Sequence, residues 1–70
     1  MKRRFEFLSG SSAKFWEVTV AKDAVTVCFG RIGTAGQAQT KSFRDSAAAQ
    51  KHADKLIEQK VGKGYVECSA

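Results

Sequence analysis

The sequence predicts an α+β fold, in which a four-stranded antiparallel sheet carries one α-helix packed on one of its faces. Three observations lead to this prediction. As far as Phe43, apolar and polar side chains alternate in short runs, which is the pattern of half-buried strands. Polar or glycine-containing segments separate these runs at intervals typical of hairpin turns. From Asp45 onwards, the apolar residues recur at the period of a helix instead.

The first strand is expected over about residues 3–8, where Phe5 and Phe7 point to one face. A flexible turn of serines and a glycine follows it at residues 9–12. The second strand, over about residues 14–20, is rich in the aromatic and β-branched residues that favour sheets. Alternation along this strand places three side chains on one face, namely Trp16, Val18 and Val20.

The third strand is expected over about residues 25–32, and strict alternation along it keeps Phe29 and Arg31 on the same face. A loop at residues 33–36 with two glycines then returns the chain. We expect residues 37–43 to form a polar fourth strand with one exposed side.

The helix is expected to begin after Asp45, whose carboxylate is a good N-cap. One apolar stripe is predicted along it, made of Ala49, Ala53, Leu56, Ile57 and Val61. Gly62 is expected to end the helix in the left-handed conformation. The segment that follows, residues 65–67, is interpreted either as a short fifth strand or as a clip.

The chain is short enough to form a single domain, residues 1–70, near the lower size limit for folding without disulfides or a metal ion. Cys28 falls inside a predicted strand, where we expect it to be a small core residue. Cys68 lies close to the chain end, and both cysteines are interpreted as free thiols in a reducing compartment. Two cysteines and one histidine are too few for a tetrahedral zinc site, so no metal site is predicted.

The amino-terminal segment is not expected to be a signal peptide, because its apolar part is short and Glu6 interrupts it. No segment approaches the length of a membrane span. The sequence therefore predicts a soluble, cytoplasmic monomer without a membrane partner.

The charge balance favours a polyanionic partner, because 12 lysines and arginines against 7 carboxylates give a net charge of +5. Catalysis is not expected, since the only histidine, His52, has no serine or cysteine placed as its nucleophile, and the carboxylates are scattered. The glycines at 30, 33 and 36 fit neither the dinucleotide-binding fingerprint nor a P-loop. We therefore predict neither an enzyme activity nor a cofactor.

The best candidate for a binding site is the junction between the third strand and the glycine loop. Phe29 can lie against a sugar or a base, and Arg31 can meet a phosphate. Lys14 begins the preceding strand, so an antiparallel hairpin brings it to the same end of the sheet, while Lys41 lies on the strand that follows. Two less specific interpretations stay open. The glycines can simply shape a hairpin turn, and the lysines can simply guard a sheet edge against aggregation.

Several segments together resemble the WGR domain family over nearly the whole chain. The most specific is residues 27–37, V-C-F-G-R-I-G-T-A-G-Q, preceded by F-W-E-V at residues 15–18. The helix at residues 49–60 and the K-G-Y at residues 63–65 are also similar to that family. The resemblance implies an antiparallel sheet with one packed helix. It also implies a link to DNA, because WGR domains occur in poly(ADP-ribose) polymerases that respond to DNA breaks, as well as in short bacterial proteins.

In those polymerases the motif tryptophan packs against a nucleotide sugar at a DNA end, and the motif arginine contacts the DNA end or a neighbouring domain. In the resemblance, Phe29 occupies the position of the motif tryptophan, Gly30 that of the motif glycine and Arg31 that of the motif arginine. It places Lys14 in a segment that also approaches DNA. Phenylalanine keeps a flat ring but lacks the indole N–H, which weakens the stacking that the family implies.

The leading hypothesis is a non-catalytic module that binds nucleic acid, DNA rather than RNA, with a preference for ends or nicks. Phe29 packs on a terminal sugar or base, and Arg31, Lys14 and Lys41 meet phosphates. The alternative hypothesis is a protein-interaction adaptor that uses the same aromatic and arginine surface.

Overall fold

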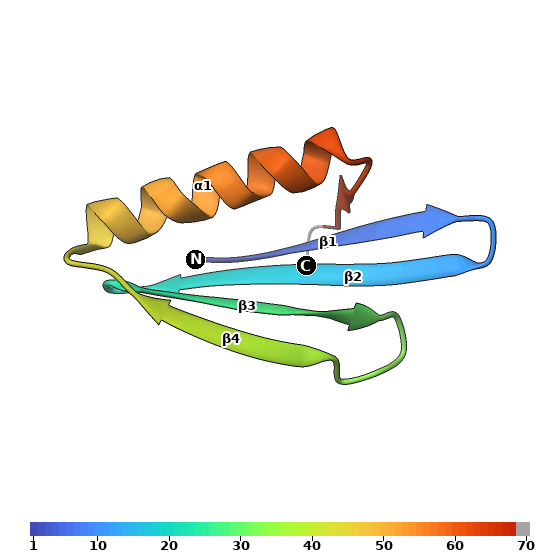
Figure 1. Ribbon diagram of the computed structural model, residues 1–70, viewed down its shortest axis with the longest axis horizontal. Helices are drawn as coiled ribbons and strands as arrows, with labels where there is room; N and C mark the ends of the chain where they lie inside the picture. Colours follow the sequence, from blue (N-terminus) through green and yellow to red (C-terminus); the bar gives the residue numbers. More distant parts are fainter. Residues whose placement is uncertain (69–70) are drawn as a thin grey trace.

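The computed structural model describes residues 1–68 and shows a five-stranded antiparallel sheet with one helix lying along it (Figure 1). The elements are β1 (Lys2–Ser9), β2 (Ser12–Ala21), β3 (Ala24–Arg31), β4 (Gln37–Ser42), α1 (Ser46–Gly62) and β5 (Val66–Glu67). Their order across the sheet is β4-β3-β2-β1-β5. The predicted α+β fold is confirmed, and the fifth strand is real, because β5 pairs with β1 at one edge of the sheet. Residues 69–70 lie outside the described part.

Cross-strand register places the large side chains of the central strands together. Trp16 in β2 lies opposite Phe5 in β1 and opposite Phe29 in β3, and Lys14 lies opposite Arg31. Because side chains alternate along a strand, these residues point to one face of the sheet, which is the face that α1 covers. We call it the inner face, and the opposite one the outer face. The alternation predicted for the second and third strands is confirmed.

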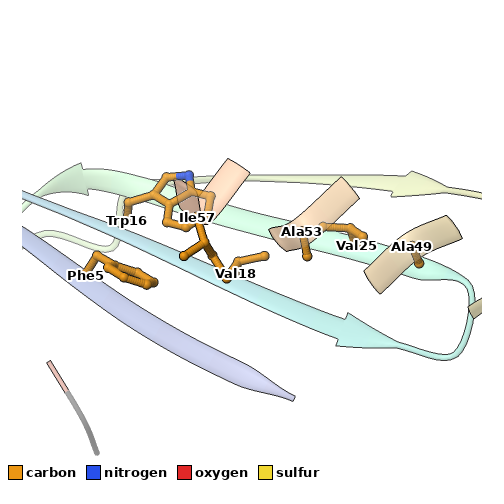
Figure 2. Close-up of a cluster of buried hydrophobic side chains, with 7 residues drawn as sticks. All are labelled: Phe5, Trp16, Val18, Val25, Ala49, Ala53 and Ile57. Atoms are coloured by element: carbon orange, nitrogen blue, oxygen red, sulfur yellow. The ribbon is translucent and has the colours of Figure 1, made fainter. Parts of the chain in front are cut away.

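The core lies between the inner face and α1 (Figure 2). It consists of Phe5, Trp16, Val18, Val25, Ala49, Ala53 and Ile57. Two of its three helical members are alanines, whose small side chains let α1 approach β2 and β3 closely. The rings of Phe5 and Trp16 are tilted by 52°, with centroids 5.7 Å apart, which is a favourable aromatic arrangement.

The start of α1 agrees with the sequence. Asp45 accepts a hydrogen bond from the backbone N–H of Ala48 at 2.7 Å, so it is the predicted N-cap.

The end of α1 differs from the prediction, because Gly62 is the last residue of the helix and the chain continues through Lys63 in a helical conformation. Gly64 takes the left-handed position instead, with φ of +105°. The Tyr65 amide then donates to the Lys60 carbonyl, and the Gly64 amide donates to a carbonyl in the last turn, which is the pattern of a Schellman motif.

The apolar stripe of α1 is shorter than predicted, since Val61 is 53% exposed. Four residues advance an α-helix by about 400°, so each step of four drifts by about 40°. After three such steps from Ala49, Val61 points about 120° away from the core. Eleven residues return almost to the starting direction, which aligns Lys60 with Ala49 on the side that faces the sheet.

Cys28 does not belong to the core, because alternation along β3 puts it on the outer face, whereas the core forms on the inner one. Its Sγ lies 3.5 Å from the carbonyl oxygen of Ala35, and the side chain is partly buried. Cys28 and Cys68 are both free thiols.

Candidate nucleic-acid interface

A groove of about 1100 Å³ runs along the inner face, over β3 and β4 and beside α1. It exists because α1 packs on β2 and β3 and leaves the β4 side of the sheet uncovered (Figure 1). Side chains of β3 and β4 form the floor. One wall is the flank of α1 that carries His52, Leu56 and Gln59.

All five residues singled out from the sequence line this groove: Lys14, Phe29, Gly30, Arg31 and Lys41. The predicted convergence of Lys14 with Arg31 at one end of the sheet is confirmed, because the two residues are cross-strand partners. The Ile32 amide donates to the Ala13 carbonyl, so the adjacent Lys14–Arg31 pair is not hydrogen-bonded through the backbone. The Cα atoms of such pairs lie about 4.5 Å apart, closer than the roughly 5.5 Å of hydrogen-bonded pairs.

The two cations at this end have no carboxylate partner in an ion pair among residues 1–68. Like charges directly opposite each other on a sheet are destabilising. Lys14 and Arg31 therefore raise the free energy of the unbound domain, and an anion placed between them lowers it again.

A tight turn fixes the backbone next to Arg31. Thr34 donates to the Arg31 carbonyl both from its amide, at 3.1 Å, and from its Oγ1 hydroxyl, at 2.7 Å. Gly33 has φ of +97°, which suits the third position of a type II turn. The glycine loop therefore holds the end of β3 in place.

Phe29 joins the core to the groove. It lies opposite Trp16, packs against the core cluster and also lines the groove while remaining only partly buried. One part of the ring is thus held by packing, and the rest is available to a ligand.

Gly30 has a packing reason to be glycine. A Cβ there would come within 2.8 Å of the Gly36 Cα, and one on Gly36 would come within 2.8 Å of the Phe15 ring. The two glycines let the loop fold over Phe15, which is only 4% exposed although it lies on the outer face. The hairpin-turn interpretation of these glycines is therefore correct in part, and a binding role of Gly30 stays a prediction.

Lys41 lies at the other end of the groove, opposite Val25. Six positions of β3 separate Val25 from Arg31, which is about 20 Å at 3.3 Å per residue. The Lys41 ammonium lies 5.6 Å from the ring centroid of Phe43, whose ring packs on His52 at 4.8 Å. We call the Lys14–Arg31 end the near end and the Lys41 end the far end.

Lys60 reaches the near end from α1. Its ammonium lies 5.7 Å from the Trp16 ring and 5.3 Å from the Tyr65 ring. Partial burial lowers the pKa of Lys60, and the positive charges of Lys63 and Lys14 lower it further. The near end is therefore a site where positive charge is crowded in the unbound protein.

The carboxylates of residues 1–68 are segregated from the groove, since none of them lines it. Glu6 and Glu17 pair with Arg4, at 3.2 and 3.0 Å, and Glu67 pairs with Arg3 at 2.6 Å. The modest net charge of the chain is therefore concentrated by the fold into one strongly basic groove.

The sequence model of the WGR domain family matches this chain over residues 1–70. The chain belongs to the WGR domain family. A WGR domain is a binding module, and membership is consistent with binding of nucleic acid.

Two Escherichia coli (strain K12) proteins and one solved structure are similar to this WGR domain. Uncharacterized protein YfeS is 40% identical over 67 residues, which are 96% of this chain and 28% of YfeS. Protein YehF is 46% identical over 65 residues, which are 93% of this chain and 24% of YehF. A crystal structure of a Bacteroides fragilis protein has a TM-score of 0.95 and 46% identity, covering 99% of this chain and 20% of that one. The chain thus spans only about a quarter of the length of the curated relatives it matches.

Lys60 is the groove cation of this WGR domain that the sequence did not predict. The signal was present, because Lys60 stands eleven residues after Ala49 and hence on the same side of the helix. It was overlooked because a step of four from Ile57 leads to Val61, an apolar residue that fits a stripe better than a lysine does.

Residues 1–68 contain no group of three histidine, cysteine or carboxylate side chains placed to hold a metal ion. In the same part of the chain, no helix has the length and apolar character that crossing a bilayer requires.

Proposed function

We propose that this WGR domain is a non-catalytic module that binds nucleic acid in the groove, with a preference for DNA ends or nicks. The composition of the groove carries the proposal, since no carboxylate from the described part of the chain lines it. Four cations and a partly exposed aromatic ring do: Lys14, Phe29, Arg31, Lys41 and Lys60. Phosphates of a nucleic acid supply the negative charge that these cations lack, and counterion release then favours binding.

The preference for ends follows from what Phe29 can reach. Inside an intact duplex each base is covered by its neighbours, whereas an end exposes a sugar and a base face, and a nick interrupts one strand so that the stack can open there. The Phe29 ring packs on that exposed surface, while Arg31, Lys14 and Lys60 meet the adjacent phosphates. We place this module in the cytoplasm as a monomer.

A fluorescence anisotropy titration tests the proposal. A labelled nicked duplex is titrated with the domain at two salt concentrations and is competed with closed circular DNA. We expect salt-sensitive binding that the closed circle competes poorly, because it offers phosphates but no interruption of the base stack. Equal competition by both DNAs would contradict the preference for ends.

Two variants assign the binding to the groove. Phe29→Leu keeps most of the apolar volume that packs on the core but removes the aromatic face, and Arg31→Gln removes an exposed charge. Both should weaken binding to the nicked duplex. Lys55→Gln is the matched control, since Lys55 is exposed on α1 and does not line the groove. If Phe29→Leu and Arg31→Gln bind as tightly as Lys55→Gln and the wild type, the assignment of the site is wrong.

A protein-interaction adaptor is the second candidate. It is favoured by the length of the relatives, about three quarters of which lies outside the region that this chain matches. An acidic segment of a partner or of a neighbouring domain would use the same Arg31 and Phe29. Absence of DNA binding at low salt, together with binding of an acidic peptide that Arg31→Gln weakens, would favour the adaptor.

A further inference from the structure

The groove carries its positive charge at two separated ends. The near end has Lys14, Arg31 and Lys60, and the far end has Lys41. About 20 Å of β3 separates the two ends, as the register of Val25 with Lys41 shows. No single phosphate reaches both ends, so a ligand that uses both of them is extended.

The middle of the groove suits bases better than phosphates. Its floor carries Val27, Phe29 and Gln39, and its wall carries Leu56 and Gln59. None of these side chains is charged. Apolar and aromatic surface packs against the faces of bases, and glutamine amides hydrogen-bond to base edges.

The floor of the groove is two strands wide and is open at the β4 edge of the sheet. Neighbouring strands lie about 4.8 Å apart, and β4 is the last strand on this side of the sheet. The floor between α1 and the sheet edge is therefore on the order of 10 Å across. One polynucleotide strand can lie along this floor with its bases flat against the apolar middle, whereas the paired and stacked bases of a duplex offer such a floor only their edges.

We infer that the groove holds a single strand of nucleic acid, which runs from the near end to Lys41 with its bases against Phe29 and Gln39. The inference rests on the proposed function, since this strand is the unpaired continuation of the end that the domain recognises. At 3.4 Å per stacked nucleotide, the groove accommodates no more than about six nucleotides. DNA and RNA single strands share the required phosphates and base faces.

A length series tests the inference. Labelled oligothymidylates of about four, six, eight and twelve nucleotides are titrated with the whole chain by fluorescence anisotropy. We expect the affinity to rise up to about six nucleotides and then to level off, because longer strands extend beyond Lys41. Oligouridylates of the same lengths show which sugar the groove prefers.

Lys41→Gln makes the test specific to the far end. Loss of one phosphate contact on a single strand should weaken binding about fivefold at roughly 0.1 M salt, since affinity scales with about the −0.7 power of salt concentration per contact. Strands of six or more nucleotides should show this loss, and strands of four should not. Lys41 is exposed, so the fold should survive the change, and Lys55→Gln again serves as the matched control.

A duplex with a single-stranded extension separates this inference from the proposed function. A blunt duplex is compared with the same duplex carrying a six-nucleotide overhang of either polarity. We expect one polarity to bind more tightly than the blunt end, because the two ends of the groove differ, and we expect Lys41→Gln to abolish that advantage. If blunt and overhanging ends bind alike while Arg31→Gln still weakens both, the inference fails and the proposed function stands. If no nucleic acid shows salt-dependent binding, both fail.

Discussion

Replacing Lys14 with glutamine should stabilise the free domain while weakening its binding to nucleic acid. Lys14 faces Arg31 across the strands without a carboxylate partner, and cross-strand pairs contribute about 0.2–1 kcal/mol, unfavourably for like charges. Taking about 0.5 kcal/mol, the change should raise the Tm by roughly 2–4 °C for a domain of this size. This gain should disappear at about 1 M salt, where the Debye length is only about 3 Å.

The same substitution removes one of three phosphate contacts at the near end. For a duplex, the slope of log affinity against log salt is about −0.9 per contact, so it should change from about −2.7 to about −1.8. Between about 50 and 200 mM salt, the wild type should then lose affinity about 40-fold, and Lys14→Gln should lose about 12-fold.

Differential scanning fluorimetry at low and high salt measures the first effect, and an anisotropy titration of a nicked duplex over the same salt range measures the second. Lys55→Gln, which removes an equal charge outside the groove, should leave the salt slope unchanged. A lower Tm for Lys14→Gln would refute the repulsion between Lys14 and Arg31 in the free domain. A salt slope equal to that of the wild type would refute the contact between Lys14 and a phosphate.

Three further predictions concern stability. Gly36→Ala should destabilise the domain by about 2 kcal/mol or more in urea denaturation, because φ is +71° and the new Cβ meets the Phe29 carbonyl oxygen and the Phe15 ring. Gly62→Ala is the control, because a Cβ at Gly62 on α1 meets no other atom, and it should stabilise the domain by about 0.5–1 kcal/mol. Equal effects of the two substitutions would contradict the packing described for the loop. Asp45→Ala should cost about 1 kcal/mol by removing the N-cap, while Asp45→Asn should retain most of that stability, as urea titrations can show. Arg3 lowers the pKa of Glu67, so the Glu67 carboxylate stabilises the fold above its ordinary pKa of 4.5, and this contribution is lost as the pH falls through the lower folded value. Glu67→Gln should therefore be less stable than the wild type at neutral pH and equal to it well below pH 4.5, and a difference that persists in acid would exclude the ion pair as its cause.

The predictions of the first four strands succeeded because their signals are local. Alternation fixes which side chains share a face, so the common face of Phe29 and Arg31 followed from spacing alone. The N-cap at Asp45 likewise depends on a contact only three residues away. The position of the terminating glycine was missed because Gly62 and Gly64 are both compatible with a helix end. The chain turns at Gly64, where the Phe7 ring of β1 lies against the backbone.

The sequence by itself determined the α+β class, the placement of Lys14 and Arg31 at one end of the sheet and the basic character of the molecule, because each depends on neighbours along the chain or across one hairpin. The tertiary structure alone decided where that charge gathers. The groove forms because α1 crosses β2 and β3 and leaves β4 uncovered, and this placement depends on how Ala49, Ala53 and Ile57 pack. The same placement brings Lys60 to the near end, whereas the register of β4 on β3 sets Lys41 about 20 Å from Arg31 along the sheet. Helix placement is set by packing between elements far apart in the chain, which no local pattern specifies.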